Sequence, residues 1–456
     1  MTTTCESDRR DERAFVIDRL ATMCTSLSAA PSHVLHATRR TLVDTIGAAA
    51  AGAATRAGQA SLKGAPLIWG SGDYSIWFSG QRSTAVGAAF VNATYAAALD
   101  LDDGHRQASG HPAAAIIPSV LACAEHNGAG ADTILTAIAL GYEVAVRVSS
   151  SREIGALRTT DSGLWCGYGV AAATAWLEGA SADTMSHAIA IAGQTSTSQA
   201  ATGFTRIGHT VKEGIPWATA NGIQAVVLAT AGHRGPVDML DERDNYVRTR
   251  LVGVPGDAWA IESGYFKLYS CCRWAHAAID GALMLQVRMS LSSGDIDTII
   301  VETFERALSL PNLPDPSTSE AAQYSIPFCI ALAMVHGEKA LLPLKEDYLG
   351  DAAVVALARR VKLVNSRNYE HAFPESTPAR VTIVGKGQVD QQEVLSPRGE
   401  PLNPLTPKAL ETKFLALMEK SPFNGKQAMA LLEAAGRLGI DREPSDLYAA
   451  LRAGVV

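Results

Sequence analysis

A short segment of the chain concentrates groups that can transfer protons. It reads Asp100-Leu-Asp-Asp-Gly-His105, and six residues later it leads into His111-Pro112. Carboxylates and imidazoles are the side chains that most often act as general acids and bases in enzymes. Here they lie between two alanine-rich apolar runs, where a globular protein normally places packing residues. The composition of this segment predicts a catalytic loop.

The loop is flanked by segments with helical periodicity. From about Pro31 to Gly235, alanine-rich stretches with apolar residues at helical spacing are separated by Gly, Asn and Asp. Alanine and glycine on several faces allow helix axes to approach closely, which favours a helical domain whose helices are enclosed by others. The segments predicted to be helical are 33–51, 83–99, 112–126, 131–148, 167–178, 182–191 and 216–231.

The chain changes character after Pro255. Segments 296–304 and 379–384 are rich in β-branched residues and are predicted to be strands. The second strand leads through Gly385-Lys-Gly387 into a hairpin. Helical periodicity between the strands makes this region α+β, and it returns in the tail from Pro407, which could pack back onto the first domain. The helices predicted between the strands are 273–289 and 320–335.

Charge, cysteine usage and hydropathy argue against several classes of protein. The chain has 39 basic and 46 acidic residues, a net charge of −7 and no run of Lys and Arg, so it does not resemble a binder of the nucleic-acid backbone. Its 7 cysteines fit neither a disulfide framework nor a zinc spacing, which predicts reduced thiols. The N-terminal residues lack the apolar region of a signal peptide, and no long apolar run predicts a membrane span. We therefore expect a cytoplasmic protein that binds neither nucleic acid nor membrane.

Four segments together carry a resemblance to a known family. They are Asn92-Ala-Thr-Tyr-Ala-Ala-Ala-Leu-Asp-Leu-Asp-Asp-Gly-His105, His111-Pro112, Lys267-Leu-Tyr-Ser-Cys-Cys-Arg-Trp-Ala-His276 and Asn403-Pro-Leu-Thr-Pro407. With them the chain resembles the MmgE/PrpD family, which includes 2-methylcitrate dehydratase, cis-aconitate decarboxylase and iminodisuccinate epimerase. The resemblance extends over nearly the whole chain, from Leu35 to about Leu417.

The resemblance implies a mainly α fold with an α+β second domain. It predicts a large all-helical domain formed by residues 1–264 together with C-terminal helices in 403–456, and a smaller α+β lid domain at 265–402. Members are expected to be homodimers, to use neither a metal nor an organic cofactor, and to hold the active site in the cleft between the domains. The change of character after Pro255 agrees with this division.

The chemistry that the resemblance implies needs two kinds of side chain. Family members act on small di- or tricarboxylates by forming or breaking a carbanion beside a carboxylate, so they need a base near the carbon acid and fixed cations for the negative charge. We assign the base to the segment 100–111 and the positive charge to Lys212, Lys267 and His276. The candidate catalytic residues are Asp100, His105, His111, Lys267 and His276, and the candidate substrate-binding residues are Lys212, Trp165, Arg158 and Tyr324.

Several neighbouring residues have simpler structural interpretations. Asp102 and Asp103 are typical of turn formers or helix caps. Cys271 and Cys272, adjacent at the start of a predicted helix, are more typical of small buried residues than of nucleophiles. Lys267 lies in an otherwise apolar stretch, where an unpaired ammonium is costly. We therefore expect it to have a carboxylate partner and take the substrate to be the natural one.

The chain departs from the family pattern at two places. Many members have a histidine where this sequence has Trp165, and in the block around Lys212 a second common histidine is replaced, with Gly214 in its place. The loss of these imidazoles removes proton donors or acceptors. Trp165 and Trp217 are expected to make the pocket drier and to suit a substrate less highly charged than citrate. Arg158 could compensate by adding positive charge.

Four functions are compatible with these residues. We predict a cofactor-independent lyase, a dehydratase or decarboxylase, acting on a small di- or tricarboxylate such as 2-methylcitrate or cis-aconitate. The alternative is an isomerase or epimerase that removes and returns one α-proton, because epimerisation needs no acid for a leaving group. A third possibility is a metal-dependent hydrolase, and a fourth is a non-catalytic carboxylate-binding protein. The ligands of the hydrolase metal would be Asp102, Asp103, His105 and His111.

Overall fold

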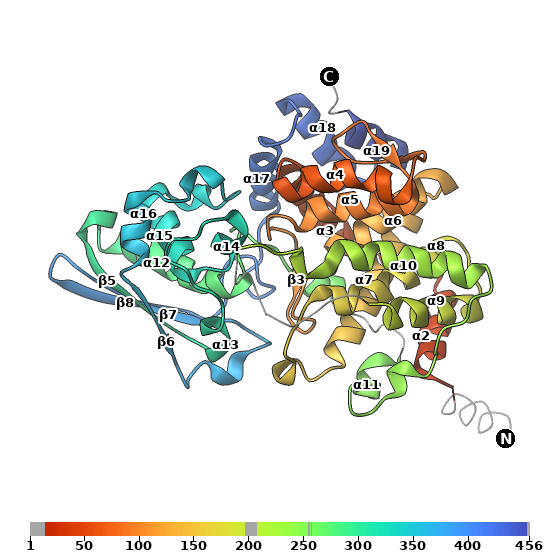
Figure 1. Ribbon diagram of the computed structural model, residues 1–456, viewed down its shortest axis with the longest axis horizontal. Helices are drawn as coiled ribbons and strands as arrows, with labels where there is room; N and C mark the ends of the chain where they lie inside the picture. Colours follow the sequence, from red (N-terminus) through yellow and green to blue (C-terminus); the bar gives the residue numbers. More distant parts are fainter. Residues whose placement is uncertain (1–13, 197–207, 254–255, 257, 454–456) are drawn as a thin grey trace.

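The computed structural model describes residues 14–196, 208–253, 256 and 258–453. Figure 1 shows two bodies side by side along the long axis, a large bundle of helices that holds both ends of the chain and a smaller body that holds the main β-sheet. The predicted fold class, mainly α with an α+β second domain, is confirmed. The N-terminal segment with Cys5, and Pro255, lie outside the described residues.

The helical domain is built from small residues, which allow its helices to pack closely. Its first helices are α2 (Val16–Ser26), α3 (Ser32–Gly52), α4 (Arg56–Trp69), α5 (Ala85–Ala97), α6 (Ala113–Asn127), α7 (Ala131–Ser150), α8 (Cys166–Leu177), α9 (Ala182–Gln194), α10 (Ile215–Thr230) and α11 (Arg248–Leu251). The centre of the core is formed by α6, α7, α8 and α10, most of whose residues are buried. A Cβ on Gly169 of α8 would lie 2.2 Å from the carbonyl oxygen of Gly141 on α7, so only glycine permits this approach.

The last part of the chain returns to the helical domain. It forms α17 (Pro407–Met418), α18 (Gly425–Gly436) and α19 (Pro444–Arg452). These helices lie beside α3 and α4 in Figure 1, and α17 packs directly on α3. Phe414 contacts the backbone of α3 where Gly47 has no side chain, since a Cβ there would lie 3.1 Å from the Phe414 ring. Residues more than 300 positions apart in the sequence therefore share one hydrophobic core.

The smaller domain is organised around a four-stranded mixed sheet. In spatial order the strands are β6 (Val361–Asn365), β5 (Ile296–Thr303), β7 (Ala379–Gly385) and β8 (Gln388–Val394). β5 pairs parallel with β6 and antiparallel with β7, and β7 pairs antiparallel with β8. Lys386 and Gly387 join the last two strands with φ values of 50° and 70°, which is the left-handed geometry of a two-residue hairpin turn.

Helices cover this sheet and form a second core. They are α12 (His276–Arg288), α13 (Glu305–Leu308), α14 (Ser319–Gln323), α15 (Ile326–His336) and α16 (Ala352–Ala358). α12 packs on β7 and β8, and α15 packs on α12 and α16. The alternate residues Val381 and Ile383 of β7 are buried with Ile279 and Phe328 in a core separate from that of the helical domain.

A pair of short strands connects the predicted catalytic loop with the start of the smaller domain. β3 (Gly104–His105) pairs antiparallel with β4 (Gly264–Tyr265), whereas the other short pair, β1 (Tyr74–Ser75) and β2 (Arg82–Ser83), lies within the helical domain. Because Gly104 lies opposite Tyr265, a Cβ at Gly104 would overlap the Tyr265 ring at 2.3 Å. This glycine therefore permits the loop to lie against the first residues of the lid.

The helices predicted in the lid are interrupted where they approach the domain boundary. The segment 273–289 begins as a 3₁₀ turn, Arg273–Ala275, before α12 starts. The segment 320–335 breaks between α14 and α15, where the Ser325 side chain accepts the amide hydrogen of Phe328 and caps α15. Both interruptions place side chains at the domain boundary.

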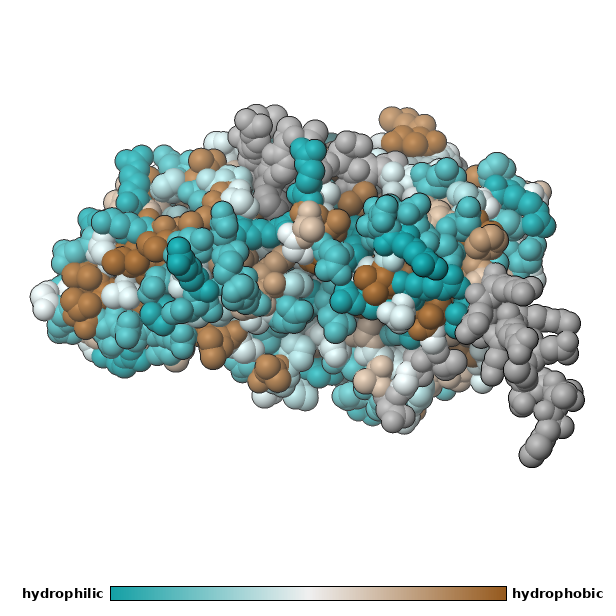
Figure 2. Space-filling model, turned by 90° about the horizontal axis from the view of Figure 1, so that it is seen from below, coloured by the Kyte–Doolittle hydropathy of each residue, from teal (hydrophilic) through white to brown (hydrophobic). Residues whose placement is uncertain are grey.

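One helix in the described residues, α7, is long and apolar enough to cross a membrane by length and composition. However, 83% of its most apolar 18-residue stretch is buried inside the protein. It packs between α6 and α8, so its apolar character is explained by the core. On the face shown in Figure 2, the apolar side chains of the described residues lie scattered among polar ones.

Candidate active site

Asp100 lies at the sharp turn that leaves α5, and its backbone is strained. It is buried, and its φ of 55° lies in the left-handed region that residues other than glycine rarely adopt. Lys212 and Glu213, at the start of α10, have φ values of 48° and 57° and contact the same region. Strained residues of this kind are typical of functional sites, where the surrounding packing enforces them.

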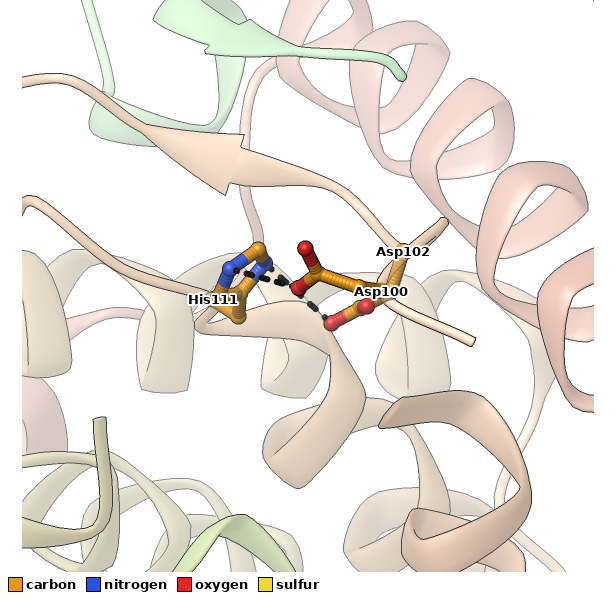
Figure 3. A group of neighbouring side chains, drawn as sticks. All are labelled: Asp100, Asp102 and His111. Atoms are coloured by element: carbon orange, nitrogen blue, oxygen red, sulfur yellow. Dashed lines mark ion pairs between the residues drawn. The ribbon is translucent and has the colours of Figure 1, made fainter. Parts of the chain in front are cut away.

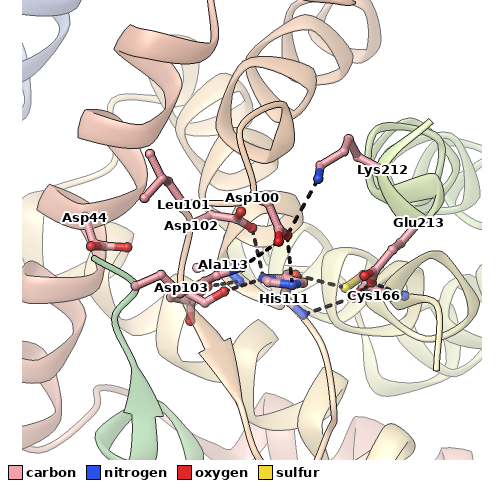
Figure 4. Close-up of polar contacts among 12 residues, drawn as sticks. Asp44, Asp100, Leu101, Asp102, Asp103, His111, Ala113, Cys166, Lys212 and Glu213 are labelled. Atoms are coloured by element: carbon pink, nitrogen blue, oxygen red, sulfur yellow. Dashed lines mark hydrogen bonds and ion pairs between the residues drawn. The ribbon is translucent and has the colours of Figure 1, made fainter. Parts of the chain in front are cut away.

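Two ammonium groups and one imidazole surround the Asp100 carboxylate. Lys267 Nζ lies 2.8 Å from Oδ2, while Lys212 Nζ and His111 Nε2 each lie 3.6 Å from Oδ1. Figure 4 shows Lys212 reaching Asp100 from the side of α10. Burial alone would raise the pKa of Asp100, but Lys212, Lys267 and His111 outweigh burial and hold that pKa well below its usual range. Asp100 is therefore an ionised carboxylate and a weak base.

The Asp100 carboxylate in turn keeps Lys267 charged. The Lys267 side chain is completely buried, and burial alone would lower its pKa. The adjacent Asp100 carboxylate overcomes burial and raises the pKa of Lys267 above its ordinary value. A buried ion pair of this kind is costly to form and more costly to break by removing one partner. The expected carboxylate partner of Lys267 is thus present within the protein itself.

His111 is held in one orientation by the loop that carries Asp100. Its Nδ1 lies 2.7 Å from the carbonyl oxygen of Asp103, which assigns the ring proton to Nδ1 and leaves Nε2 facing Asp100. Burial alone would lower the pKa of His111, but Asp102, Glu213 and Asp100 outweigh burial and raise it. An imidazole whose pKa is raised from about 6.5 is well suited to donate and accept a proton near neutral pH.

Asp103 supports the loop from the side of α6. Its Oδ1 accepts the amide hydrogen of Ala113 at the start of α6, and its Oδ2 accepts the hydroxyl of Tyr142 at 2.8 Å. Burial raises the pKa of Asp103 to about 7. It therefore acts as the helix cap that its sequence position suggested, whereas Asp102 faces His111 Nδ1 at 3.4 Å.

A small cavity lies between the helical domain and the lid at this point. Its volume is about 40 Å³, which is room for roughly one water molecule. The helical domain contributes Asp100, His105, Arg106, His111 and Glu213 to its lining, and the lid side contributes Tyr265, Cys272, Arg273, Trp274 and Tyr324. In this structure the cavity is too small for a di- or tricarboxylate.

A second charged group, which the sequence did not indicate, contributes Arg106 and Arg273 to the cavity lining. Arg106 and Arg273 both form ion pairs with the buried carboxylate of Glu400. The Tyr265 ring lies between the two guanidinium groups, with its centroid 4.9 Å from Cζ of Arg106 and 4.8 Å from Cζ of Arg273. Arg106 and Arg273 lie within or beside the segments that carried the family resemblance, but nothing in the sequence links either to Glu400.

Two models of one protein family match most of the chain. Residues 18–254 match the model of the MmgE/PrpD N-terminal domain, and residues 269–435 match that of the MmgE/PrpD C-terminal domain. The chain belongs to the MmgE/PrpD family. It is similar to a cis-aconitate decarboxylase of Aspergillus terreus, with 26% identity over 390 residues that cover 77% of this chain and 78% of the relative. It is also similar to a cis-aconitate decarboxylase-like protein of Aspergillus oryzae, with 23% identity over 402 residues covering 81% and 83%.

Five residues that the MmgE/PrpD resemblance singled out lie together at or beside the cavity: Asp100, His111, Lys212, Lys267 and Tyr324. Lys212 Nζ donates to Gln323 Oε1 at 2.7 Å and lies 5.3 Å from the centroid of the Tyr324 ring. The break between α14 and α15 therefore presents lid side chains to Lys212.

His105 lies at the edge of the same cavity. It is buried and also lines a larger cleft of about 720 Å³, formed mostly by the helical domain together with Pro374 and Glu375 of the lid. Burial lowers its pKa to about 4, and although the Ala260 carbonyl lies close enough to oppose this effect, neither ring nitrogen makes an aligned hydrogen bond to the described residues. His105 is thus a neutral imidazole at the edge of the site, unlike His111.

His276 lies behind the cavity lining rather than in it. Its Nδ1 accepts a hydrogen bond from Arg273 at 3.0 Å, and its Nε2 lies 3.3 Å from the Cys271 carbonyl oxygen. Burial and the Arg273 charge lower the pKa of His276 well below its usual value. In this structure, His276 therefore orients Arg273. Burial also raises the pKa of the Cys272 thiol at the cavity, so that group is not a thiolate.

The remaining candidates do not line the cavity. Trp165 is buried behind its lining, against Gly110, where a Cβ would approach the Trp165 ring to 2.7 Å, and Arg158 lines a different cavity of about 460 Å³. Trp217 is 42% exposed and packs against Phe90. The expectation that Trp217 makes the pocket drier is therefore wrong, because α10 turns this side chain away from the cavity.

The residues do not fit a single metal ion. Asp100, Asp102 and His111 lie close enough to one another to suggest a ligand group (Figure 3). However, Asp100 faces Nε2 and Asp102 faces Nδ1 of the same ring, so these two contacts are not directed at one common ion. The Lys267 ammonium at 2.8 Å from Asp100 also competes with a cation for that carboxylate. Both oxygens of Asp103, another predicted ligand, already accept hydrogen bonds.

Proposed function

We propose that this protein is a lyase that removes carbon dioxide or water from a small di- or tricarboxylate, using its own side chains for proton transfer. The observation that carries the proposal is the ionised Asp100 between two lysines, with His111 Nε2 directed at the same carboxylate. The similarity to proteins named cis-aconitate decarboxylase over most of both chains supports the same reaction class.

The two lysines at Asp100 suit an anionic substrate. Lys212 and Lys267 both contact the Asp100 carboxylate, so two ammonium groups lie at or beside the cavity lining. The same fixed charges stabilise the negative charge that develops beside a substrate carboxylate when a C–C or C–H bond breaks. Because Asp100, Lys212 and Lys267 are buried, this stabilisation is stronger than it would be at the surface.

His111 is the group best placed to move the proton. With its Nδ1 proton held by the Asp103 carbonyl, the Nε2 atom exchanges a proton with the substrate carbon. In a decarboxylation, the C–C electron pair passes into the adjacent unsaturated system, carbon dioxide leaves, and protonated His111 delivers its Nε2 proton to carbon. In a dehydration, His111 instead takes the α-proton, and a second group must protonate the departing hydroxyl. Decarboxylation needs the smaller set of groups, so we propose it as the reaction.

The test is proton NMR in D₂O of the purified protein with cis-aconitate, 2-methylcitrate, citrate and iminodisuccinate. A lyase produces new product signals together with release of carbon dioxide or water. Loss of an α-proton signal without net elimination would show instead an isomerase that returns the proton to the same carbon. The Asp100→Asn protein serves as the control for contaminating activity, and absence of any reaction with this panel would contradict the proposal.

A further inference from the structure

Arg106 crosses the domain boundary to reach a carboxylate of the lid. It follows directly after β3 in the helical domain, and its guanidinium lines the cavity. Nε lies 3.2 Å from Glu400 Oε2, Nη2 bonds Glu400 Oε1, and Nη2 also donates to Thr377 Oγ1 at 2.8 Å. This two-point contact is the geometry in which arginine recognises a carboxylate.

Arg273 binds the same carboxylate but is fixed within the lid. Its Nε donates to Glu400 at 2.8 Å, and its other nitrogens contact His276 and the carbonyl oxygens of Pro397 and Arg398. Arg106 has a smaller set of partners, Glu400 and Thr377, and both belong to the other domain. The hydrogen bonds of Arg273 therefore all lie within the lid, whereas the hydrogen bonds of the Arg106 side chain to Glu400 and Thr377 cross the domain boundary.

Two groups of cations lie at or beside the cavity lining. Lys212 and Lys267 contact Asp100, and Arg106 and Arg273 share Glu400. The Asp100 group also contains the carboxylates of Asp102 and Glu213, whereas Arg106 and Arg273 share the single carboxylate of Glu400. Burial would raise the pKa of Glu400, but the two arginines outweigh burial and lower it, so this carboxylate is ionised. A molecule with carboxylates at two positions complements both groups of cations, whereas a monocarboxylate complements only one.

We propose that Arg106 binds a second carboxylate of the substrate, and that Glu400 holds the Arg106 guanidinium while the site is empty. The inference rests on the proposed function, because it assumes a polycarboxylate ligand. Substrate entry replaces one carboxylate partner of Arg106 by another, so the ion pair of Arg106 is exchanged rather than lost. This exchange would make Arg106 the residue that selects di- and tricarboxylates over monocarboxylates.

The experiment is calorimetric binding of two unreactive probes, tricarballylate (propane-1,2,3-tricarboxylate) and butyrate, to the full-length protein. Replacing Arg106→Gln should weaken tricarballylate binding by about tenfold to a hundredfold, the worth of a charge-assisted hydrogen-bonded pair, and leave butyrate binding unchanged. Arg106→Lys keeps the positive charge, so it should weaken tricarballylate binding less than Arg106→Gln does. Glu400→Gln removes the internal competitor and should tighten tricarballylate binding. Arg288→Gln is the matched control, since Arg288 pairs with Asp390 on the exposed face of the lid.

Equal tricarballylate affinities for wild type and Arg106→Gln, or equal losses for both probes, would overturn the inference, as would a wild-type protein that binds no tricarballylate. Turnover separates this failure from that of the proposed function. If Arg106→Gln processes a polycarboxylate with unchanged KM, the inference fails and the lyase proposal stands. If no acid is processed while tricarballylate binding still depends on Arg106, the lyase proposal fails and the binding site stands.

Discussion

Two buried aspartate–lysine pairs lie on opposite sides of the same loop, and they differ in what surrounds them. In front, Asp100 pairs with Lys267 at 2.8 Å and links the helical domain to the lid. Behind, Asp44 of α3 pairs with Lys413 of α17 at 2.5 Å, and Lys413 also donates to the Leu101 carbonyl oxygen at 2.7 Å. Figure 4 shows Asp44 on the far side of the loop from Lys212.

The difference lies in what each pair contacts. The rear pair is one cation and one anion within a single domain, fixed to the loop backbone through Leu101. The front pair belongs to a larger buried group, to which Lys212 adds a second ammonium, His111 an imidazole, and Asp102 and Glu213 two further carboxylates. Several buried ionisable groups gathered beside a cavity are typical of a functional site. The same pair of residue types thus serves as scaffold behind the loop and as binding site in front of it.

The largest expected effect comes from Asp100→Asn, which removes the shared carboxylate and leaves the buried Lys267 ammonium unpaired. We expect kcat/KM to fall by about 10³-fold or more, and the free energy of unfolding to fall by about 3–5 kcal/mol. Steady-state kinetics and urea unfolding measure the two effects. In the Asp100→Asn/Lys267→Met double variant, stability should recover while activity should not. Recovery of activity in that variant would show that Asp100 serves only the fold.

His111→Gln tests the acid–base half of the front site. Loss of the imidazole should lower kcat by about 10²–10⁴-fold, with a small change in stability, because the glutamine amide can still donate to the Asp103 carbonyl. His105→Gln is the matched control, since its pKa of about 4 leaves it neutral and outside the Asp100 contacts. If His105→Gln slows the reaction more than His111→Gln, the roles assigned to these histidines are reversed.

The rear pair should behave as structure alone. Lys413→Met leaves the buried Asp44 carboxylate unpaired and should lower the free energy of unfolding by about 3–5 kcal/mol. Adding Asp44→Leu should restore most of that loss of stability. About 1 kcal/mol should remain lost, because the hydrogen bond from Lys413 to the Leu101 carbonyl oxygen is absent. Chemical denaturation of the three variants checks this. If the double variant is as unstable as Lys413→Met, the loss of stability does not come from an unpaired Asp44 carboxylate, and the pair stabilises the fold in another way.

The sequence predicted the elements that depend on residues close together in the chain better than those that depend on distant residues. The helical segments 112–126 and 131–148 were recovered closely as α6 and α7, because periodicity and alanine content act locally. Strand β6 was missed, since none of its five residues is fully buried and its pattern lacks the alternation of a half-buried strand.

The residues of the candidate site also divide into those that local sequence indicates and those that it does not. Asp100, His111 and Lys267 were found from local composition and family blocks, and the structure brings them together. Glu400 was missed because its partner Arg106 is 294 residues away and a single glutamate in a loop carries no local signal. The direction of Trp217 depends on how α10 packs, which the sequence of one helix with apolar residues on several faces does not determine.

Asp103 should make the stability of the protein depend on pH. Its folded-state pKa of about 7 lies above that of an unfolded aspartate, so the folded state retains a proton that the unfolded state has lost. The contribution of Asp103 to stability is therefore present below about pH 4 and is lost as the pH rises to about 7, on the order of a few kcal/mol. His105 has a lowered pKa, so its contribution to stability changes with pH in the opposite direction. The effect of Asp103 must therefore be measured as the difference between wild type and a variant at Asp103.

Urea unfolding of wild type and Asp103→Asn between pH 4.5 and 7.5 provides that difference. Asparagine cannot ionise, so the variant should lose less stability than wild type as the pH rises. Parallel curves would show that Asp103 is ionised throughout this range. Tyr142→Phe is the control, since it removes the hydroxyl bond to Asp103 but keeps the titrating carboxyl.

The smallest expected effect is that of chelation, and it tests whether the front of the loop is an acid–base site or a metal site. The Asp100 and Asp102 carboxylates face different nitrogens of His111 (Figure 3), and Lys267 occupies the side of Asp100 that a cation would need. Dialysis against EDTA should therefore leave kcat and KM unchanged. A loss of activity that added Zn²⁺ or Mn²⁺ restores would place a metal beside His111. In that case Lys212 and Lys267 would need a role other than binding of a substrate carboxylate.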